Sequence, residues 1–223
     1  WRTLWQRKLN VAWLPPENVF LRVVQLPAAS PEETRAMVEL QLEKLSPIPV
    51  TQAVWAIHTL PEIKDNQQTL VVILVARDIV EEFLGQLEGQ GFLADRLELS
   101  LLDQLQATAV NADGAWIYAG SADAHGTALV AWWYGGVLRN LSLANLPAAG
   151  DRVGQGRQQL TQAAWAGELE GWLTSAPVWH LVADETAARE WEPVLRQAFD
   201  EPVRVISQNT LEDLAAQTAH RAA

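Results

Sequence analysis

Side chains suited to acid–base chemistry are few in this chain. Asp123 and His125 lie close together in a short polar turn and have the chemistry of an acid–base pair. No serine lies in a G-x-S-x-G nucleophile elbow, and His58, His125, His180 and His220 have no metal-ligand spacing. There is no cysteine, which excludes thiolate sites and disulfides. We therefore expect His125 to be simply a polar residue of the turn. We expect no catalytic residue, no metal site and no enzyme activity.

Two glycine motifs have the letters of a phosphate or anion site. Gly89–Ala94 reads G-x-G-x-x-A, but it follows an expected helix and precedes an expected strand, the reverse of a dinucleotide fingerprint. We expect it to end a helix. Gly154-Gln155-Gly156, flanked by Arg152 and Arg157, has the pattern of an anion site at a helix N-terminus. A flexible loop between domains is the interpretation we favour.

The aromatic run Trp132-Trp133-Tyr134 is the first candidate for binding a partner protein, because Trp and Tyr dominate interface hot spots. Adjacent residues of a strand point to opposite faces, so we expect one tryptophan in the core and the other exposed or at an interface. An exposed edge strand, in the N-terminal half or in this aromatic ribbon, is a second candidate because it can accept a partner strand. The basic, aromatic stretch 1–8 is either a docking segment or a frayed terminus.

Composition narrows the class of protein. The 223 residues are 49% apolar, which predicts a folded chain with a substantial core. A net charge of −11 argues against binding nucleic acid or an anionic membrane and favours a basic protein partner. No apolar run reaches the roughly 18 to 20 residues of a transmembrane helix, and no signal peptide is visible. Because the chain begins at Trp1 rather than Met, we expect a fragment whose membrane segment lies outside it.

The first half alternates strands and helices. The spacing predicts strands over 9–14, 19–26, 52–60 and 69–76, with a polar loop over 61–68. Ser30 predicts a helix N-cap, with Pro31 at the first helical position, Glu33 completing a capping box, and the helix continuing to Leu45. The strand 69–76, TLVVILVA, is apolar without alternation, as in strands buried on both faces.

Further signals complete this half. Asp78 and Glu81 predict a second capping box, followed by a helix that ends near Gly89 and Gly91. A short strand is expected over 96–99, and Ser100 is expected to cap the next helix.

The second half begins after the polar stretch 111–114, the best boundary between two halves. Three strands are expected over 115–119, 127–134 and 137–143, the last two joined by a Gly135-Gly136 reversal. The pattern then predicts a helix to about Leu173 and strands over 178–182 and 203–206. A helix that begins at Asp184 or Thr186 is expected between these two strands, and a last helix capped by Asn209 with Glu212 is expected after them. Alternation of this kind indicates an α/β domain with a partly parallel sheet.

The order of these motifs resembles a known family. The stretch LPAASPEE at 26–33, the helix ending in LSPIPV, a strand with Val54-Trp55 and the unit LVVILVARDIVEEFLGQLEGQGF are similar to the cytoplasmic actin-like domain of the type II secretion L component and its type IV pilus relatives, the PilM-like family. The three-stranded ribbon and the Ala-rich stretch 210–223 also fit.

The resemblance implies an α/β, actin-like (RNase H-like) fold of mixed sheets flanked by helices. Its two similar halves would be 1–111 and 112–223. It implies a non-catalytic scaffold on the cytoplasmic face of the bacterial inner membrane. Such a scaffold recruits the secretion or pilus assembly ATPase and contacts inner-membrane proteins of the same machine.

An actin-like fold also raises the alternative of a nucleotide-binding ATPase or a sugar-kinase-like enzyme. Its phosphate sites need a glycine-rich hairpin and a Mg²⁺-binding carboxylate in each half. In the second half Ile117-Tyr118-Ala119-Gly120 keeps the glycine but has no Asp, and the first-half turn has Pro15-Pro16 and no glycine. Asp184-Glu185 replaces a late glycine pair and would repel phosphate. We therefore expect no cofactor.

Overall fold

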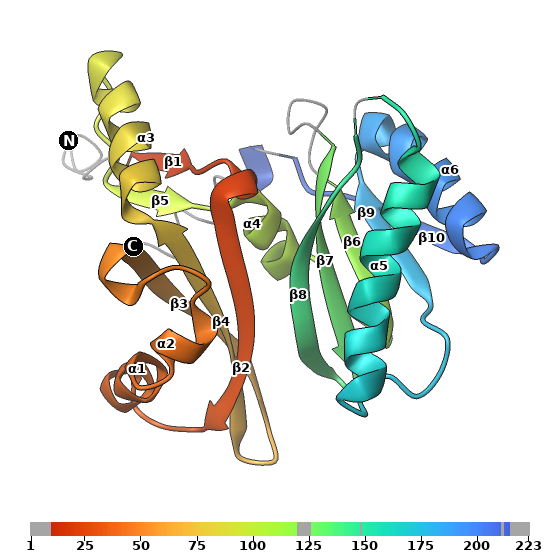
Figure 1. Ribbon diagram of the computed structural model, residues 1–223, viewed down its shortest axis with the longest axis horizontal. Helices are drawn as coiled ribbons and strands as arrows, with labels where there is room; N and C mark the ends of the chain where they lie inside the picture. The colour runs from red at the N-terminus through yellow and green to blue at the C-terminus, as the bar shows by residue number, and fades with distance from the viewer. Residues whose placement is uncertain (1–9, 120–125, 148, 211, 215–223) are drawn as a thin grey trace, which may run out of the picture.

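The computed structural model describes residues 10–119, 126–147, 149–210 and 212–214, and its strands form three sheets (Figure 1). In the N-terminal lobe, β2 (Val19–Pro27), β4 (Gln67–Ala76) and β3 (Ala53–Lys64) form an antiparallel sheet in that order. Nearby, β1 (Val11–Trp13) pairs in parallel with β5 (Arg96–Glu98). The C-terminal lobe contains a five-stranded mixed sheet, in the order β10 (Val203–Ser207), β9 (Trp179–Ala183), β6 (Gly114–Ala119), β7 (Thr127–Tyr134) and β8 (Val137–Asn145).

Helix α1 (Pro31–Glu39) begins as the sequence predicts. The Ser30 hydroxyl accepts a hydrogen bond from the Glu33 N–H, and the Glu33 carboxylate accepts one from the Ser30 N–H at 3.0 Å. The expected single helix to Leu45 is instead two, because the chain breaks after Glu39 and resumes as α2 (Leu42–Leu45). The two pieces bury Val38 and Leu42 in one core cluster with the central strand β4.

The polar loop predicted over 61–68 is wrong, because β3 and β4 continue to a two-residue turn. Asp65 and Asn66 adopt φ angles of 51° and 59°. Asn and Asp tolerate this left-handed region, so a tight turn closes the hairpin. The pairing register shifts between Thr59 and Ile63, where Pro61 has no N–H to donate. The hairpin therefore extends well beyond the expected strand ends.

Helices α3 (Arg77–Gly89) and α4 (Ser100–Ala107) lie where they are expected, but their predicted caps are wrong. The N-cap of α3 is Ala76 and that of α4 is Leu99, and neither side chain caps its helix. Both helices begin directly from an extended segment, so Asp78 and Ser100 already lie inside them. Gly91, at φ 84°, follows the end of α3, which confirms the helix-end interpretation of Gly89–Ala94.

The central ribbon of the C-terminal lobe is confirmed as β6 (Gly114–Ala119), β7 (Thr127–Tyr134) and β8 (Val137–Asn145). Strands β9 (Trp179–Ala183) and β10 (Val203–Ser207) add in parallel beside β6. Helices α5 (Arg152–Leu169) and α6 (Glu185–Phe199) cover one face of this sheet (Figure 1). The core between them is rich in tryptophan, with Trp132, Trp179 and Trp191 fully buried.

Two local expectations in this lobe are corrected. Gly154-Gln155-Gly156 is not a loop but the start of α5, because the Asp151 carboxylate accepts a hydrogen bond from the Gly154 N–H at 2.7 Å and caps the helix. Near the C-terminus Thr210, not Asn209, acts as the cap. Its hydroxyl accepts from the Asp213 N–H at 3.1 Å.

The opposite face of the five-stranded sheet joins the two lobes. A second core cluster contains Leu21 and Val71 of the N-terminal lobe, Leu105 of α4, and Tyr118 and Leu138 of the C-terminal lobe. Strands β2 and β8 lie side by side there without pairing (Figure 1). The buried side-chain amide of Gln104 in α4 donates a hydrogen bond to the Asn209 carbonyl (2.6 Å) and accepts one from the Asn209 N–H (3.2 Å). These two bonds hold the segment after β10 against α4. The division into 1–111 and 112–223 stays a prediction.

Candidate functional site: a cleft between the lobes

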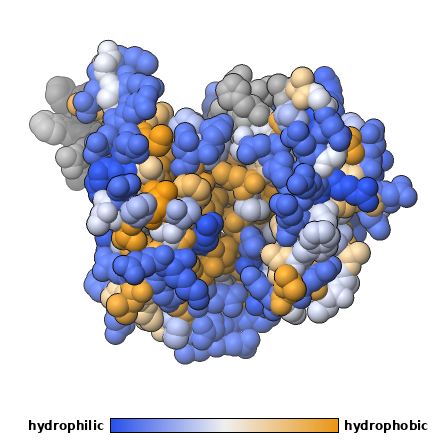
Figure 2. Space-filling view, viewed as in Figure 1, coloured by the Kyte–Doolittle hydropathy of each residue, from blue (hydrophilic) through white to orange (hydrophobic). Residues whose placement is uncertain are grey.

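A cleft of about 850 Å³ separates the C-terminal part of β3 from the β7–β8 hairpin, with the end of α4 and the segment 108–113 that follows it between them. Figure 2 shows apolar groups in the hollow between the two lobes. We call this site the interlobe cleft. Its apolar and aromatic walls come from β3, α4, the segment after α4 and the hairpin, and they include Leu60, Pro61, Leu105, Ala109, Val110, Ala112, Trp133, Val137 and Leu138.

Two hairpin tips meet at one side of the interlobe cleft. Gly135 and Gly136 adopt φ angles of 64° and 67°, which a two-residue reversal between β7 and β8 requires. The Lys64 ammonium group, at the end of β3, donates a hydrogen bond to the Gly135 carbonyl. The tight Asp65-Asn66 turn therefore brings the N-terminal lobe into contact with the C-terminal lobe.

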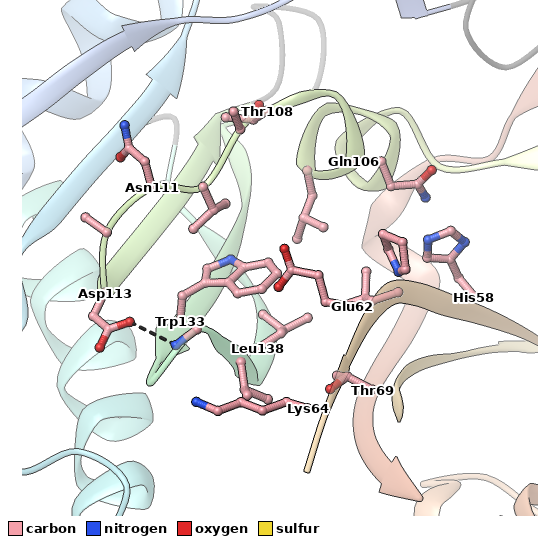
Figure 3. Close-up of a pocket in the computed structure, with 18 residues that line it drawn as sticks. His58, Glu62, Lys64, Thr69, Gln106, Thr108, Asn111, Asp113, Trp133 and Leu138 are labelled. Atoms are coloured by element: carbon pink, nitrogen blue, oxygen red, sulfur yellow. Dashed lines mark hydrogen bonds between the residues drawn. The ribbon is translucent and has the colours of Figure 1, made fainter. Parts of the chain in front are cut away.

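Asp113 fixes the β7–β8 hairpin at the cleft wall. Its carboxylate accepts hydrogen bonds from the Gly135 N–H at 2.9 Å and the Gly136 N–H at 3.3 Å, the second of which is drawn in Figure 3. Both amides belong to a tight turn and have no other partner within the hairpin ladder. The carboxylate thus satisfies two donors that would otherwise need water.

Trp133 lies at the centre of the cleft wall, with its indole ring among the lining side chains (Figure 3). Its Nε1–H is buried and has no hydrogen-bond partner among the described residues. A buried donor without a partner costs about 1–3 kcal/mol, which a ligand carbonyl can recover by accepting the bond. The cleft therefore offers an apolar surface with an unused N–H donor.

The polar groups of the cleft supply both charge and hydrogen-bonding capacity. Glu62, Lys64 and Asp113 supply charge, and Thr69, Thr108 and Asn111 supply uncharged hydrogen-bonding groups. His58 also lines the cleft and has an interaction of its own. Among the described residues no cluster of His, Asp and Glu could hold a metal ion. The arrangement can accept an extended apolar segment and hydrogen-bond its backbone.

The three aromatic residues predicted to bind a partner separate in the structure. Trp132 is fully buried beneath α5 and α6, so the prediction that it contacts a partner is corrected: it fills the core. Trp133 points to the opposite face, into the cleft. Tyr134 is half-buried against Trp172, with ring centroids 5.5 Å apart. Burial, and secondarily the Asp113 carboxylate, raises the pKa of Tyr134 to about 12.

Sequence reasoning missed Glu62, Lys64 and Asp113 as parts of this site. The overlooked signal is the pair Asp65-Asn66, which favours a tight turn. A turn at these two residues predicts longer strands on both sides of it. With that turn, Glu62 and Lys64 become strand residues near a hairpin tip.

The positions considered for phosphate binding have other structural roles where they are described. Pro16–Asn18 form a single 3₁₀ turn. The Asp184 carboxylate caps α6 by accepting a hydrogen bond from the Ala187 N–H at 2.7 Å, which confirms the helix-cap interpretation. Asp123 and His125 lie outside the described residues. None of the helices in the described part of the chain has the length and hydrophobicity needed to span a bilayer.

The comparisons with known proteins point to one kind of fold. No family model matches the sequence, and no curated protein does. Among solved structures, the PilM–PilN type IV pilus biogenesis complex is similar with a TM-score of 0.61 at 16% identity, over 90% of this chain and 70% of that one. The cytoplasmic domain of EpsL, an inner-membrane component of the type II secretion system of Vibrio cholerae, has a TM-score of 0.54 at 14% identity, over 98% of this chain and 77% of that one.

Sheets flanked by helices, arranged as in these two structures, confirm the fold class expected from the sequence. The resemblance noted from the sequence motifs is thus confirmed as a likeness of fold. This chain has the PilM-like and EpsL-like actin-like α/β fold.

Proposed function

We propose that this chain is a non-catalytic scaffold domain of a type II secretion or type IV pilus-like assembly, on the cytoplasmic face of the inner membrane. It recruits the assembly ATPase and other proteins of the same machine through protein contacts. The support is its likeness of fold to PilM, solved in a complex with PilN, and to the cytoplasmic domain of EpsL. The interlobe cleft is the contact surface in this proposal.

The observation that carries the proposal is the unpartnered indole N–H of Trp133 in an apolar cleft. Extended protein segments carry a backbone carbonyl at every residue and apolar side chains beside it. Such a segment satisfies the Trp133 donor and covers the apolar walls, as aromatic anchors do at the centre of interfaces.

The charges around the cleft favour a segment with a basic residue. Glu62 and Asp113 carry two negative charges, while Lys64, the one lysine among the described residues that line the cleft, already donates to the Gly135 carbonyl. The chain as a whole carries −11. A basic residue next to apolar residues would be attracted to this mouth, most strongly at low salt.

The alternative function, a nucleotide-binding ATPase, has weaker support. A phosphate group at the N-terminus of α6 would have to displace the Asp184 carboxylate, which already bonds that helix end. The turn before β2 is built from prolines and has no glycine to approach a phosphate closely.

Isothermal titration of the chain tests both functions. The titrants are the N-terminal domain of the assembly ATPase, cytoplasmic segments of inner-membrane proteins from the same machine, and ATP with Mg²⁺. We expect binding of at least one protein titrant and no saturable binding of ATP. Saturable ATP binding would make the ATPase alternative the better reading.

Two tryptophan substitutions locate the contact. Ala109 is exposed on the cleft wall, so Ala109→Trp fills the cleft without disturbing the core. Ala29 is also exposed, in the loop before α1, so Ala29→Trp is the matched control. Ala109→Trp should weaken protein binding at least tenfold, about 1.4 kcal/mol, and Ala29→Trp should leave it unchanged. Equal binding by both variants would remove the cleft from the proposal.

A further inference from the structure

Helices α5 and α6 cover the same face of the five-stranded sheet (Figure 1). Their outer surfaces carry different side chains. The outer surface of α6 carries ion pairs, Glu185 with Arg189 and Glu192 with Arg196. On α5, five exposed residues at spacings of three and four form one uncharged line, which we call the α5 stripe: Gln155, Gln158, Gln162, Trp165 and Leu169.

The C-terminal end of the α5 stripe is apolar and open to solvent. The exposed fraction is 60% for Trp165 and 89% for Leu169. Apolar surface is visible on this lobe at the lower end of α5 in Figure 2. Large exposed apolar side chains bordered by polar ones are typical of a protein contact surface.

Two exposed charges lie along one flank of the stripe. Arg157 and Glu168 form no ion pair within the described residues. Gln162 and Ala163 lie midway between them in the sequence. If two copies of α5 run antiparallel with Gln162 and Ala163 at the centre, Arg157 of each copy lies opposite Glu168 of the other. A two-fold axis makes this pairing occur twice.

We propose that a second copy of this chain covers the α5 stripe, in an antiparallel helix pair across a two-fold axis at Gln162 and Ala163. Trp165 and Leu169 of one copy then lie over the glutamine half of the other copy's stripe. Because each copy carries a net charge of −11, the copies repel least where the facing stripe is uncharged and the flanking charges, Arg157 and Glu168, meet with opposite sign. The contact uses a different surface from the interlobe cleft and does not depend on the proposed function.

The size of the contact predicts a weak, reversible dimer. The 18 residues of α5 extend over about 27 Å. A contact made by one such helix per copy lies at the low end of specific interfaces, below about 1,200 Å². We expect dissociation constants on the order of 10 μM to 1 mM.

Sedimentation equilibrium of the full chain, over a concentration series covering this range, tests the proposal. The variants are Gln162→Glu, which places two carboxylates at the axis, Arg157→Glu, which opposes like charges, and the double variant Arg157→Glu with Glu168→Arg, which restores the pairing. Gln197→Glu, on the exposed surface of α6, is the matched control. Circular dichroism checks that each variant folds.

We expect the unchanged chain and Gln197→Glu to associate equally. Gln162→Glu and Arg157→Glu should each weaken association at least tenfold, and the double variant should recover it. A chain that stays monomeric over the whole series overturns the proposal. So does an Arg157→Glu variant that dimerises normally, or a double variant that remains as weak as the single one.

Discussion

Tyr118 offers the sharpest test of the core between the lobes. Its side chain is fully buried, and its hydroxyl has no hydrogen-bond partner among the described residues. A hydroxyl buried in this way costs about 1–3 kcal/mol, and replacing it by hydrogen leaves the ring contacts in place. We predict that Tyr118→Phe raises the free energy of unfolding by about 1 kcal/mol, which raises Tm by about 2–4 °C in a chain of this size.

The same residue sets how stability depends on pH. Burial raises the pKa of Tyr118 well above its ordinary value of 10. Below pH 10 the folded and unfolded chains both hold the proton, so this residue adds no pH dependence. Above pH 10 the unfolded chain loses the proton and the folded chain keeps it. The free energy of unfolding then falls by about 1.4 kcal/mol per pH unit until the folded pKa is reached. Tyr134, whose ring is half-exposed, adds a smaller fall of the same sign.

Urea unfolding followed by tryptophan fluorescence measures both effects, at neutral pH and in steps above pH 10. The chain has only two tyrosines, so tyrosinate absorbance reports them directly. The folded chain should show no tyrosine ionisation at pH 10, whereas in denaturant each tyrosine should be about half ionised at that pH. Tyr134→Phe is the control and should leave the larger part of the alkaline fall intact. A lower stability of Tyr118→Phe at neutral pH, or a native tyrosine ionising at its ordinary pKa, would refute this reasoning.

Three further predictions concern the backbone, a helix end and a buried histidine. Gly114 has a φ of 145°, and a Cβ there would clash with the Val178 carbonyl. Gly114→Ala should therefore lower the free energy of unfolding by about 1–3 kcal/mol in the same urea unfolding assay. Gly89 has open space around it, so the control Gly89→Ala should be neutral or stabilising. Ser30→Ala should lower stability by about 1 kcal/mol, because the capping box of α1 is lost; Ser30→Thr should recover most of it by the same measurement. Burial, and secondarily the charge of Arg204, lowers the pKa of His180, so its imidazole should titrate below 6.5 by NMR and stability should fall as pH drops below that value; an imidazole titrating at or above 6.5 would contradict this.

Local signals in the sequence predicted most elements, because each signal acts over a few residues. The Ser30 capping box, the Asp184 cap and the Gly135-Gly136 reversal all lie where they were expected. In each case one side chain, or one glycine pair, satisfies or permits the backbone geometry beside it. Local signals failed where two of them competed. The glycines at 154 and 156 favour a loop, but the Asp151 side chain caps a helix that contains both.

Local sequence signals could not predict the interlobe cleft. It is formed by β3, by the end of α4 with the segment 108–113, and by the β7–β8 hairpin, parts of the chain that are separated in the sequence. The sequence indicated that Trp132 and Trp133 face opposite sides of a strand but not which side is the core. Both faces of β7 are covered, one by α5 and α6 and the other by α4 and the N-terminal lobe, so polar residues do not alternate along it. Only the packed structure distinguishes the two residues.

The amide pairing of Gln104 with Asn209 has a consequence for how the chain is made. The two residues are 105 positions apart, and Gln104 is buried. At synthesis rates of about 5–20 residues per second, the ribosome completes this interval in about 5–20 s. Until then the Gln104 side chain has no Asn209 backbone to bond, and α4 can dock only incompletely. The nascent N-terminal lobe can form its own sheet early, but the joint between the lobes cannot close fully before Asn209 has been synthesised.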